Sequence, residues 1–187
     1  GCVFIAMDAM IRAYEFLPSA ELKACIEELL PRFLAVDQVA IKAQAHATLT
    51  GIRALLRYGR RYLPEAEERF RRYRENCMTT AFANANWFTR FDTFTEPCAI
   101  VDSYMVALKL WELTGKADDL ELADRIYWNA ICRAQRRNGG FGLETCPTAA
   151  APELKVHEPE AHWCCTMRGA EGLSTAADFV VRTNGNV

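Results

Sequence analysis

The sequence predicts an all-α protein whose helical hairpins form part of an (α/α)6 toroid. Apolar residues recur with helical spacing along most of the chain, and no segment shows the alternation of a convincing strand. Short links join paired helices, while two long irregular segments carry the unusual side chains, an arrangement typical of toroids with loop-borne chemistry. A toroid of six hairpins needs about twelve helices of about 12 residues. We therefore expect the 187 residues to be a single domain, 1–187, and a fragment of a longer catalytic barrel.

Four helices are predicted in the first half of the chain. Ser19 is a suitable N-cap for the second helix, which Pro31 is expected to kink or end. The third helix contains His46, and Pro64 lies where the first turn of the fourth helix accepts proline. The predicted ranges are 2–16, 19–31, 39–58 and 64–77.

The second half contains two irregular segments between helices. Residues 78–94 lose the helical period and are rich in aromatic and amide side chains, and long loops of this kind often carry function. Pro97 suits the first position of the next helix, and Gly139 and Gly140 end the helix after that. A second irregular segment follows them and extends to Trp163. The predicted helices are 97–114, 118–135 and 166–179.

Charge and hydropathy exclude two classes of partner. Lys and Arg number 22 against 24 Asp and Glu, so nucleic acid is not an expected partner. No segment approaches the run of about 18 apolar residues that a membrane-spanning helix needs, and we expect a soluble protein with no membrane partner. The chain opens like the middle of a helix, so any signal peptide would precede Gly1. The sequence therefore indicates neither the compartment nor the oligomeric state.

The eight cysteines fall into two groups. Four of them stand singly in helical patterns, where a free thiol behaves as a small apolar side chain in the core. The other four lie at the edges of segments, beside Glu, Pro, Trp or another Cys. The first group is Cys2, Cys25, Cys77 and Cys132, and the second is Cys98, Cys146, Cys164 and Cys165.

A zinc site is the chemical interpretation of the second group. Glu96 and Cys98 flank Pro97 at a predicted helix start, and Cys164 and Cys165 are adjacent at another. One carboxylate and three thiols suit a tetrahedral zinc ion. Two alternatives stay open: Glu96 caps its helix while Cys98 packs, or Cys164 and Cys165 form a strained vicinal disulfide. Cys146 mimics the Glu-x-Cys pair, but no second pair of thiols remains to complete another site.

These residues resemble glycoside hydrolase family 127, the β-L-arabinofuranosidases, over about half the chain. The order and spacing of the pieces carry the likeness, since each piece alone is weak. The matching runs are Thr95-Glu96-Pro97-Cys98-Ala99-Ile100-Val101-Asp102, Leu113-Thr114-Gly115, Ala123-Asp124-Arg125-Ile126-Tyr127-Trp128-Asn129-Ala130 and Cys164-Cys165.

The resemblance implies an (α/α)6 barrel followed by a β-sandwich, and a retaining glycosidase that binds Zn²⁺. Glu96, Cys98, Cys164 and Cys165 match the metal ligands, and Cys164 matches the nucleophile. The acid/base glutamate of the family falls at Thr80, a residue that cannot take that role. Asp92, His162 or a residue of the missing barrel are then the candidates.

The substrate implied by the resemblance is an oligosaccharide or glycoside, such as a β-L-arabinofuranoside. The candidate contacts are one histidine, one amide and two tryptophans, because aromatic faces and amides suit sugars. Core packing is the alternative for the histidine and for the aromatic side chains of the loop. The candidates are His46, Asn86, Trp87 and Trp163.

Two other functions remain as alternatives to the glycosidase. The first is a non-catalytic carbohydrate-binding or scaffold domain, in which the three cysteines and the glutamate hold a structural zinc ion. The second is a redox switch based on the vicinal disulfide.

Overall fold

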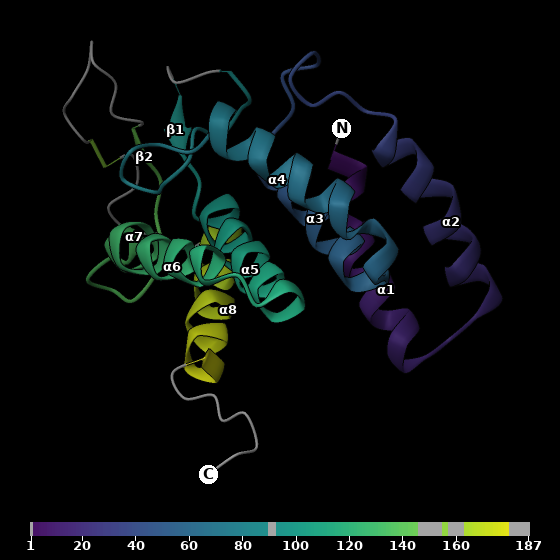
Figure 1. Cartoon of the computed structure of the whole chain (residues 1–187). Coiled ribbons are helices and arrows are strands. Elements are labelled where there is room, and N and C mark those ends of the chain that lie inside the picture. The colour runs from purple at the N-terminus through teal and green to yellow at the C-terminus, as the bar shows by residue number, and fades with distance from the viewer. Residues whose placement is uncertain (1, 90–92, 146–154, 157–162, 180–187) are drawn as a thin grey trace.

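Helical hairpins build the structure, a computed structural model that describes residues 2–89, 93–145, 155–156 and 163–179 (Figure 1). Short 3-10 turns at Cys2–Ile5 (η1) and Arg60–Tyr62 (η2) and a π-helical turn at Tyr127–Ile131 (η3) adjoin the α-helices. The helices are α1 (Ala6–Phe16), α2 (Ala20–Leu34), α3 (Ala45–Tyr58), α4 (Leu63–Asn76), α5 (Pro97–Thr114), α6 (Ala117–Ile126), α7 (Cys132–Ala134) and α8 (Cys164–Phe179).

The hairpins stack in two layers. Helix α1 packs against α2, α3 against α4, and α5 against α6. Helix α3 also packs against α1 and α5, and α5 packs against α8. The inner layer therefore consists of α1, α3, α5 and α8. Helices α2, α4 and α6 form the outer layer, each packed against its hairpin partner. This arrangement confirms the predicted all-α fold of helical hairpins.

Helix α5 is the centre of the core, because it is covered from both sides. Most of its residues from Pro97 to Leu110 are buried, which explains why its sequence is apolar almost all round. Gly115 ends it in the left-handed region, at φ 72°, where glycine pays no steric cost. Helix α8 lies close to the loop residue Phe141 at Gly169, where any side chain would overlap the Phe141 ring.

Pro31 does not end α2, which was one of the two outcomes expected of it. The helix continues to Leu34, and the backbone N–H of Ala35 still reaches the carbonyl of Pro31 at 3.0 Å. Pro31 is exposed, so water can solvate the carbonyl that its missing N–H leaves unpaired. Phe33, buried one residue before the end, holds the last turn against the core.

The predicted start of the third helix, at residue 39, is also wrong. Asp37 accepts hydrogen bonds from the N–H groups of Val39 and Ala40, which makes a turn there instead of a helix. Gln44 is extended and pairs with Trp87 in an isolated antiparallel bridge, so α3 begins at Ala45. Local side-chain hydrogen bonds and a distant loop thus override the helical pattern.

Two further predictions need correction at the second irregular segment. A two-stranded antiparallel sheet, β1 (Phe94–Thr95) and β2 (Glu144–Thr145), forms where no strand was expected. Strands of two residues are too short to show an alternating pattern. Helix α8 begins at Cys164, two residues earlier than predicted, which puts both vicinal cysteines in its first turn.

The single cysteines differ in burial. Cys77 is fully buried, as predicted, whereas Cys25 is exposed on α2 and Cys132 is half-buried. The prediction of core packing is therefore wrong for Cys25. None of the helices in the described ranges is long and apolar enough to cross a membrane.

Candidate functional site

Three helix N-termini meet at one end of the inner layer. Cys98 lies in the first turn of α5 and Cys164 begins α8, and their Sγ atoms are 3.6 Å apart. His46, the second residue of α3, reaches Asp102 of α5 with its Nδ1 atom at 2.5 Å from Oδ2. Because helix N-termini carry partial positive charge, this end of the layer favours thiolates and carboxylates.

The four predicted zinc ligands come together here. One ligand atom from each of Glu96, Cys98, Cys164 and Cys165 lies within 4.8 Å of all the others. Cys98, Cys165 and Glu96 are buried, while Cys164 is exposed. All four come from the first turns of α5 and α8 or from the residue just before α5, so the packing of these two helices sets the geometry of the cluster.

The spacing of the sulfur atoms fits a tetrahedral ion. Cys98 Sγ lies 3.6 Å from Cys164 Sγ and 3.7 Å from Cys165 Sγ. With zinc–sulfur bonds of about 2.3 Å, the edge of a tetrahedron measures about 3.8 Å. A disulfide would need about 2.05 Å between the sulfur atoms. The donor set and its spacing therefore suit zinc.

Crowding without a cation makes these groups hard to ionise together. The hydrogen bond to Cys165 and burial raise the pKa of the Cys98 thiol. Burial also raises the pKa of Cys164 and of the Glu96 carboxyl. The hydrogen bond from Cys98 lowers the pKa of Cys165. A bound cation would reverse this preference, because it stabilises every deprotonated ligand.

The cluster opens into a cavity of about 460 Å³. Three of the four predicted sugar contacts, Asn86, Trp87 and Trp163, line this cavity together with Cys164. Asn86 is 4% exposed, and its Oδ1 atom has no hydrogen-bond partner in the described structure. The remaining lining residues are Gln44, Phe94, Glu96, Phe141, Gly142, Leu143 and Cys165.

His46, the fourth predicted sugar contact, is not among the residues that line the cavity. Its side chain is 14% exposed and hydrogen-bonds to Asp102. Burial alone would lower the pKa of His46, but the hydrogen bond and the charge of Asp102 raise it above its ordinary value. Asp102 and the nearby Glu96 therefore favour the protonated form of the histidine.

Asp102 is the centre of a buried ion-pair network below the cluster. It is fully buried and contacts His46, Thr50, Arg53 and Arg168, with 2.6 Å from Arg53 Nη1 to Oδ1. Burial opposes its charge, but His46, Arg168 and Arg53 hold the pKa of Asp102 well below its usual range. The network thus ties α3, α5 and α8 together.

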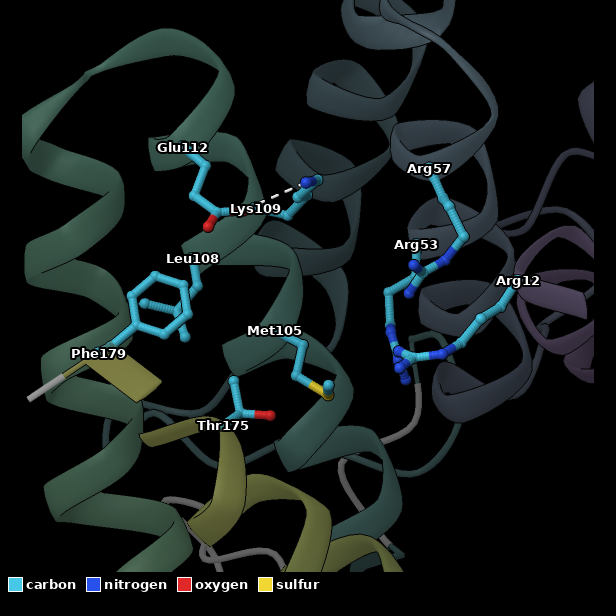
Figure 2. A pocket seen from close by; sticks show the side chains of 9 residues that line it. All are labelled: Arg12, Arg53, Arg57, Met105, Leu108, Lys109, Glu112, Thr175 and Phe179. Atoms are coloured by element: carbon cyan, nitrogen blue, oxygen red, sulfur yellow. Dashed lines mark hydrogen bonds and ion pairs between the residues drawn. The ribbon is translucent and has the colours of Figure 1, made fainter. Parts of the chain in front are cut away.

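The network extends to a separate cavity of about 240 Å³, here called the arginine cavity (Figure 2). Figure 2 shows the side chains of Arg12, Arg53 and Arg57 converging on one side of it. Asp8 pairs with Arg53 at 3.0 Å and with Arg57 at 2.8 Å, and Arg53 also reaches Glu171 at 3.2 Å. These carboxylates offset the guanidinium charges, so we assign this cavity to the structural network.

Several predicted residues lie outside the described ranges. Asp92 and His162, two of the candidates for the acid/base, are among them, and so is Cys146.

Four residues of the site were missed from the sequence: Gln44, Arg53, Asp102 and Arg168. Two of them had a usable signal, because Asp102 follows Cys98 by four residues and Arg168 follows Cys164 by four. In a helix this spacing puts both members of each pair on one face. Arg53 is a charge within the apolar stripe of α3. Gln44 carries no such signal, because only the loop that pairs with it places it at the cavity.

No family model and no curated protein matches the chain. Among solved structures, the GH76A alpha-1,6-mannanase of Salegentibacter sp. HEL1_6 is similar, with a TM-score of 0.70 and 16% identity. An inactive variant of that mannanase in complex with alpha-1,6-mannotriose gives a TM-score of 0.72, also at 16% identity. In both comparisons the match covers 95% of this chain and 56% of the mannanase. The chain therefore shares the α/α helical fold of these two structures and spans little more than half of their length.

Proposed function

We propose that this chain forms the zinc-binding part of a retaining glycoside hydrolase of the family 127 type, with Cys164 as its nucleophile. The observation that carries the proposal is the position of the cluster: four ligand atoms lie within 4.8 Å of one another at the wall of a cavity of about 460 Å³. The cavity also has the aromatic and amide side chains that suit a sugar. Glycosidases with the same fold support the reaction class.

Zinc held by Glu96, Cys98, Cys164 and Cys165 would keep the thiols deprotonated at neutral pH. Cys164 is the exposed thiol of the cluster, whereas Cys98 and Cys165 are buried. A sugar in the cavity therefore meets Cys164 first. The network of Asp102 and Arg168 lies one turn deeper on the same two helices and holds them in register.

The reaction follows from this arrangement in two displacements. The Cys164 thiolate attacks the anomeric carbon, the bond to the leaving oxygen breaks, and an acid gives that oxygen a proton. The same group, now a base, takes a proton from water as the water oxygen displaces the Cys164 sulfur. Two inversions leave the anomeric configuration unchanged. Asp92, His162 or a residue of the missing barrel remain the candidates for the acid/base.

The similar solved structures suggest a different catalytic group, a pair of aspartates. The inactive mannanase variant has two adjacent aspartates replaced by asparagine. In this chain the only adjacent aspartates are Asp118 and Asp119, in the first turn of α6, and neither lines the cavity of the cluster. The proposed mechanism therefore uses the cysteine cluster and no aspartate pair, and the proposed substrate, a β-L-arabinofuranoside or a related glycan, is the one that the resemblance implies.

A Cys164→Ala variant of the full-length protein tests the nucleophile. Hydrolysis of aryl β-L-arabinofuranosides and of alpha-1,6-mannotriose is measured. We expect the variant to lose activity on whichever of these substrates the wild-type protein hydrolyses. The matched control is Cys25→Ala, because Cys25 is exposed on α2, away from the cluster. Mass spectrometry of the quenched wild-type enzyme should show a glycosyl adduct on the peptide that contains Cys164. Unchanged hydrolysis by Cys164→Ala would sink the assignment.

A second candidate is a carbohydrate-binding domain with a structural zinc site. One observation favours it: among the described residues that line the cavity, Glu96 is the only one with a carboxyl group. Such a domain would bind zinc and a saccharide without hydrolysing any substrate. Zinc analysis combined with the hydrolysis assay separates the two functions.

A further inference from the structure

A second cavity, of about 280 Å³, adjoins the cavity of the cluster. Gln44 and Trp87 line both of them. The walls of the second cavity come from η1, the end of α2, the turn that follows it and the first turn of α3. Its other lining residues are Phe4, Phe33, Val36, Gln38, Ile41, Lys42, Ala43, Ala47 and Thr48.

The wall between the two cavities is held by backbone hydrogen bonds. Gln44 and Trp87 form an antiparallel bridge. The N–H of Ala45 donates to the carbonyl of Asn86 at 2.9 Å, and the N–H of Phe88 donates to the carbonyl of Ala43, also at 2.9 Å. The bridge therefore fixes the backbone of Trp87 between the two cavities. A ligand that reaches from one cavity to the other passes the side chains of Gln44 and Trp87.

The lining of the second cavity combines aromatic rings with uncharged polar groups. Phe4, Phe33 and Trp87 supply the rings, and Gln38 and Gln44 supply amides. No carboxylate of the described chain lines it, and its one charged group is the ammonium of Lys42. This composition suits a neutral, hydroxyl-bearing ligand with an apolar face, which is the chemistry of a sugar ring.

Gln38 provides an independent sign of a ligand. The residue is 4% exposed, and its Nε2 atom has no hydrogen-bond partner within the described ranges. A buried amide donor that stays unpaired destabilises the folded chain. A ligand hydroxyl or ring oxygen that accepts from this amide would remove the destabilisation.

The far wall of the cavity is rigid. Phe33 packs edge to face against Phe4, with ring centroids 5.2 Å apart. The guanidinium of Arg69 lies 5.0 Å from the centroid of the Phe33 ring and donates to the carbonyl of Leu34 at 2.6 Å. Arg69 therefore fastens the end of α2, including the Phe33 ring that lines the cavity, to α4. A wall that is already ordered binds its ligand without a further loss of conformational entropy.

We propose that this cavity is a second sugar subsite, which takes the next residue of a saccharide whose first residue lies in the cavity of the cluster. The inference rests on the proposed function in one respect, that the ligand is a saccharide. It adds that the preferred ligand has at least two sugar residues. Trp87 is the side chain that both residues contact.

Binding of thio-linked saccharides tests the subsite without requiring hydrolysis. The probes are methyl monosaccharides and sulfur-linked disaccharides of the β-L-arabinofuranose and alpha-1,6-mannose series, titrated against the intact protein by calorimetry. We expect the disaccharide of one series to bind about tenfold more tightly than its monosaccharide, a gain of about 1.4 kcal/mol. Gln38→Ala and Ala47→Leu, which remove the amide and fill the cavity, should abolish this gain and leave the monosaccharide affinity unchanged.

Gln135→Ala is the matched control, because Gln135 is exposed and lies outside the cavity. Circular dichroism establishes that each variant folds, and the two variants act by different means. Equal affinity for mono- and disaccharide, or a gain that survives both substitutions, overturns the subsite. Hydrolysis of oxygen-linked substrates is measured separately. If the disaccharide binds more tightly but no substrate is hydrolysed, the subsite is supported and the proposed enzyme is contradicted. If a substrate is hydrolysed but the disaccharide binds no more tightly, the enzyme is supported and the subsite is contradicted.

Discussion

The Sγ atoms of Cys98 and Cys164 lie 3.6 Å apart, although 66 positions separate the two residues in the chain. Each lies in the first turn of its helix, and the two helices pack against each other. The distance matches the edge of a zinc–thiolate tetrahedron and is too long for a disulfide. The contact between α5 and α8 therefore has a chemical role as well as a structural one.

Zinc content is the first prediction. The protein purified under reducing conditions should hold one zinc ion per chain, and chelation should lower its Tm, because the ion binds only the folded state. Cys98→Ser should weaken zinc binding by about 100-fold or more in competition with a chelator of known affinity. Cys25→Ser is the control, since this thiol is exposed and stands alone. Equal zinc affinity in both variants would contradict the site.

Asp102→Asn should destabilise the protein strongly. Asp102 is fully buried and pairs with Arg53 and Arg168, so the substitution leaves two guanidinium groups without their shared carboxylate. Removing one partner of a buried pair costs about 3–5 kcal/mol, and we expect a loss at the lower end of that range in urea unfolding. Asp118→Asn, at an exposed helix start, should cost less than about 1 kcal/mol. Similar losses in the two variants would show that the network contributes little.

The stability of the protein should depend on the charge of His46. Burial opposes that charge, but Asp102 raises the pKa of His46 above its ordinary value, so the folded state binds the proton more tightly than the unfolded chain. This contribution is complete below about pH 6.5 and is lost as the pH rises through the folded-state pKa. The free energy of unfolding, measured without metal between about pH 6 and 9, should fall in the wild type more than in His46→Gln. Parallel curves would refute the coupling.

Asn86→Ala should separate binding from stability. The Oδ1 atom of Asn86 is buried at the cavity without a hydrogen-bond partner in the described structure, so its removal breaks no bond of that atom. The variant would lose the hydrogen bond that a sugar hydroxyl donates to this atom, and such a bond contributes about 1–3 kcal/mol. We expect saccharide affinity to drop by about tenfold or more while Tm stays the same or rises. The exposed Asn129→Ala serves as the control. A variant that loses Tm but keeps its affinity would show Asn86 to be structural.

Much of the fold was accessible from local pattern. The helical period, Ser19 as an N-cap and Gly115 as a C-cap all describe interactions within a few residues, and α4 and α5 begin and end close to the predicted positions. The errors arose where distant contacts compete with local preference. Gln44 is extended because it pairs with Trp87, and a pattern confined to residues 39–58 contains no trace of that pairing.

By itself the sequence determined which residue types were available for chemistry: a carboxylate two residues from a thiol, and two adjacent thiols at the start of another helix. Tertiary structure decided that they meet, and that Asp102 and Arg168, one turn further along the same two helices, pair with each other and, through Asp102, with Arg53 of α3. The physical reason is that helical spacing fixes neighbours only within one helix. The distance between Cys98 and Cys164 depends on how α5 and α8 pack, and that packing is the sum of many weak contacts along both helices.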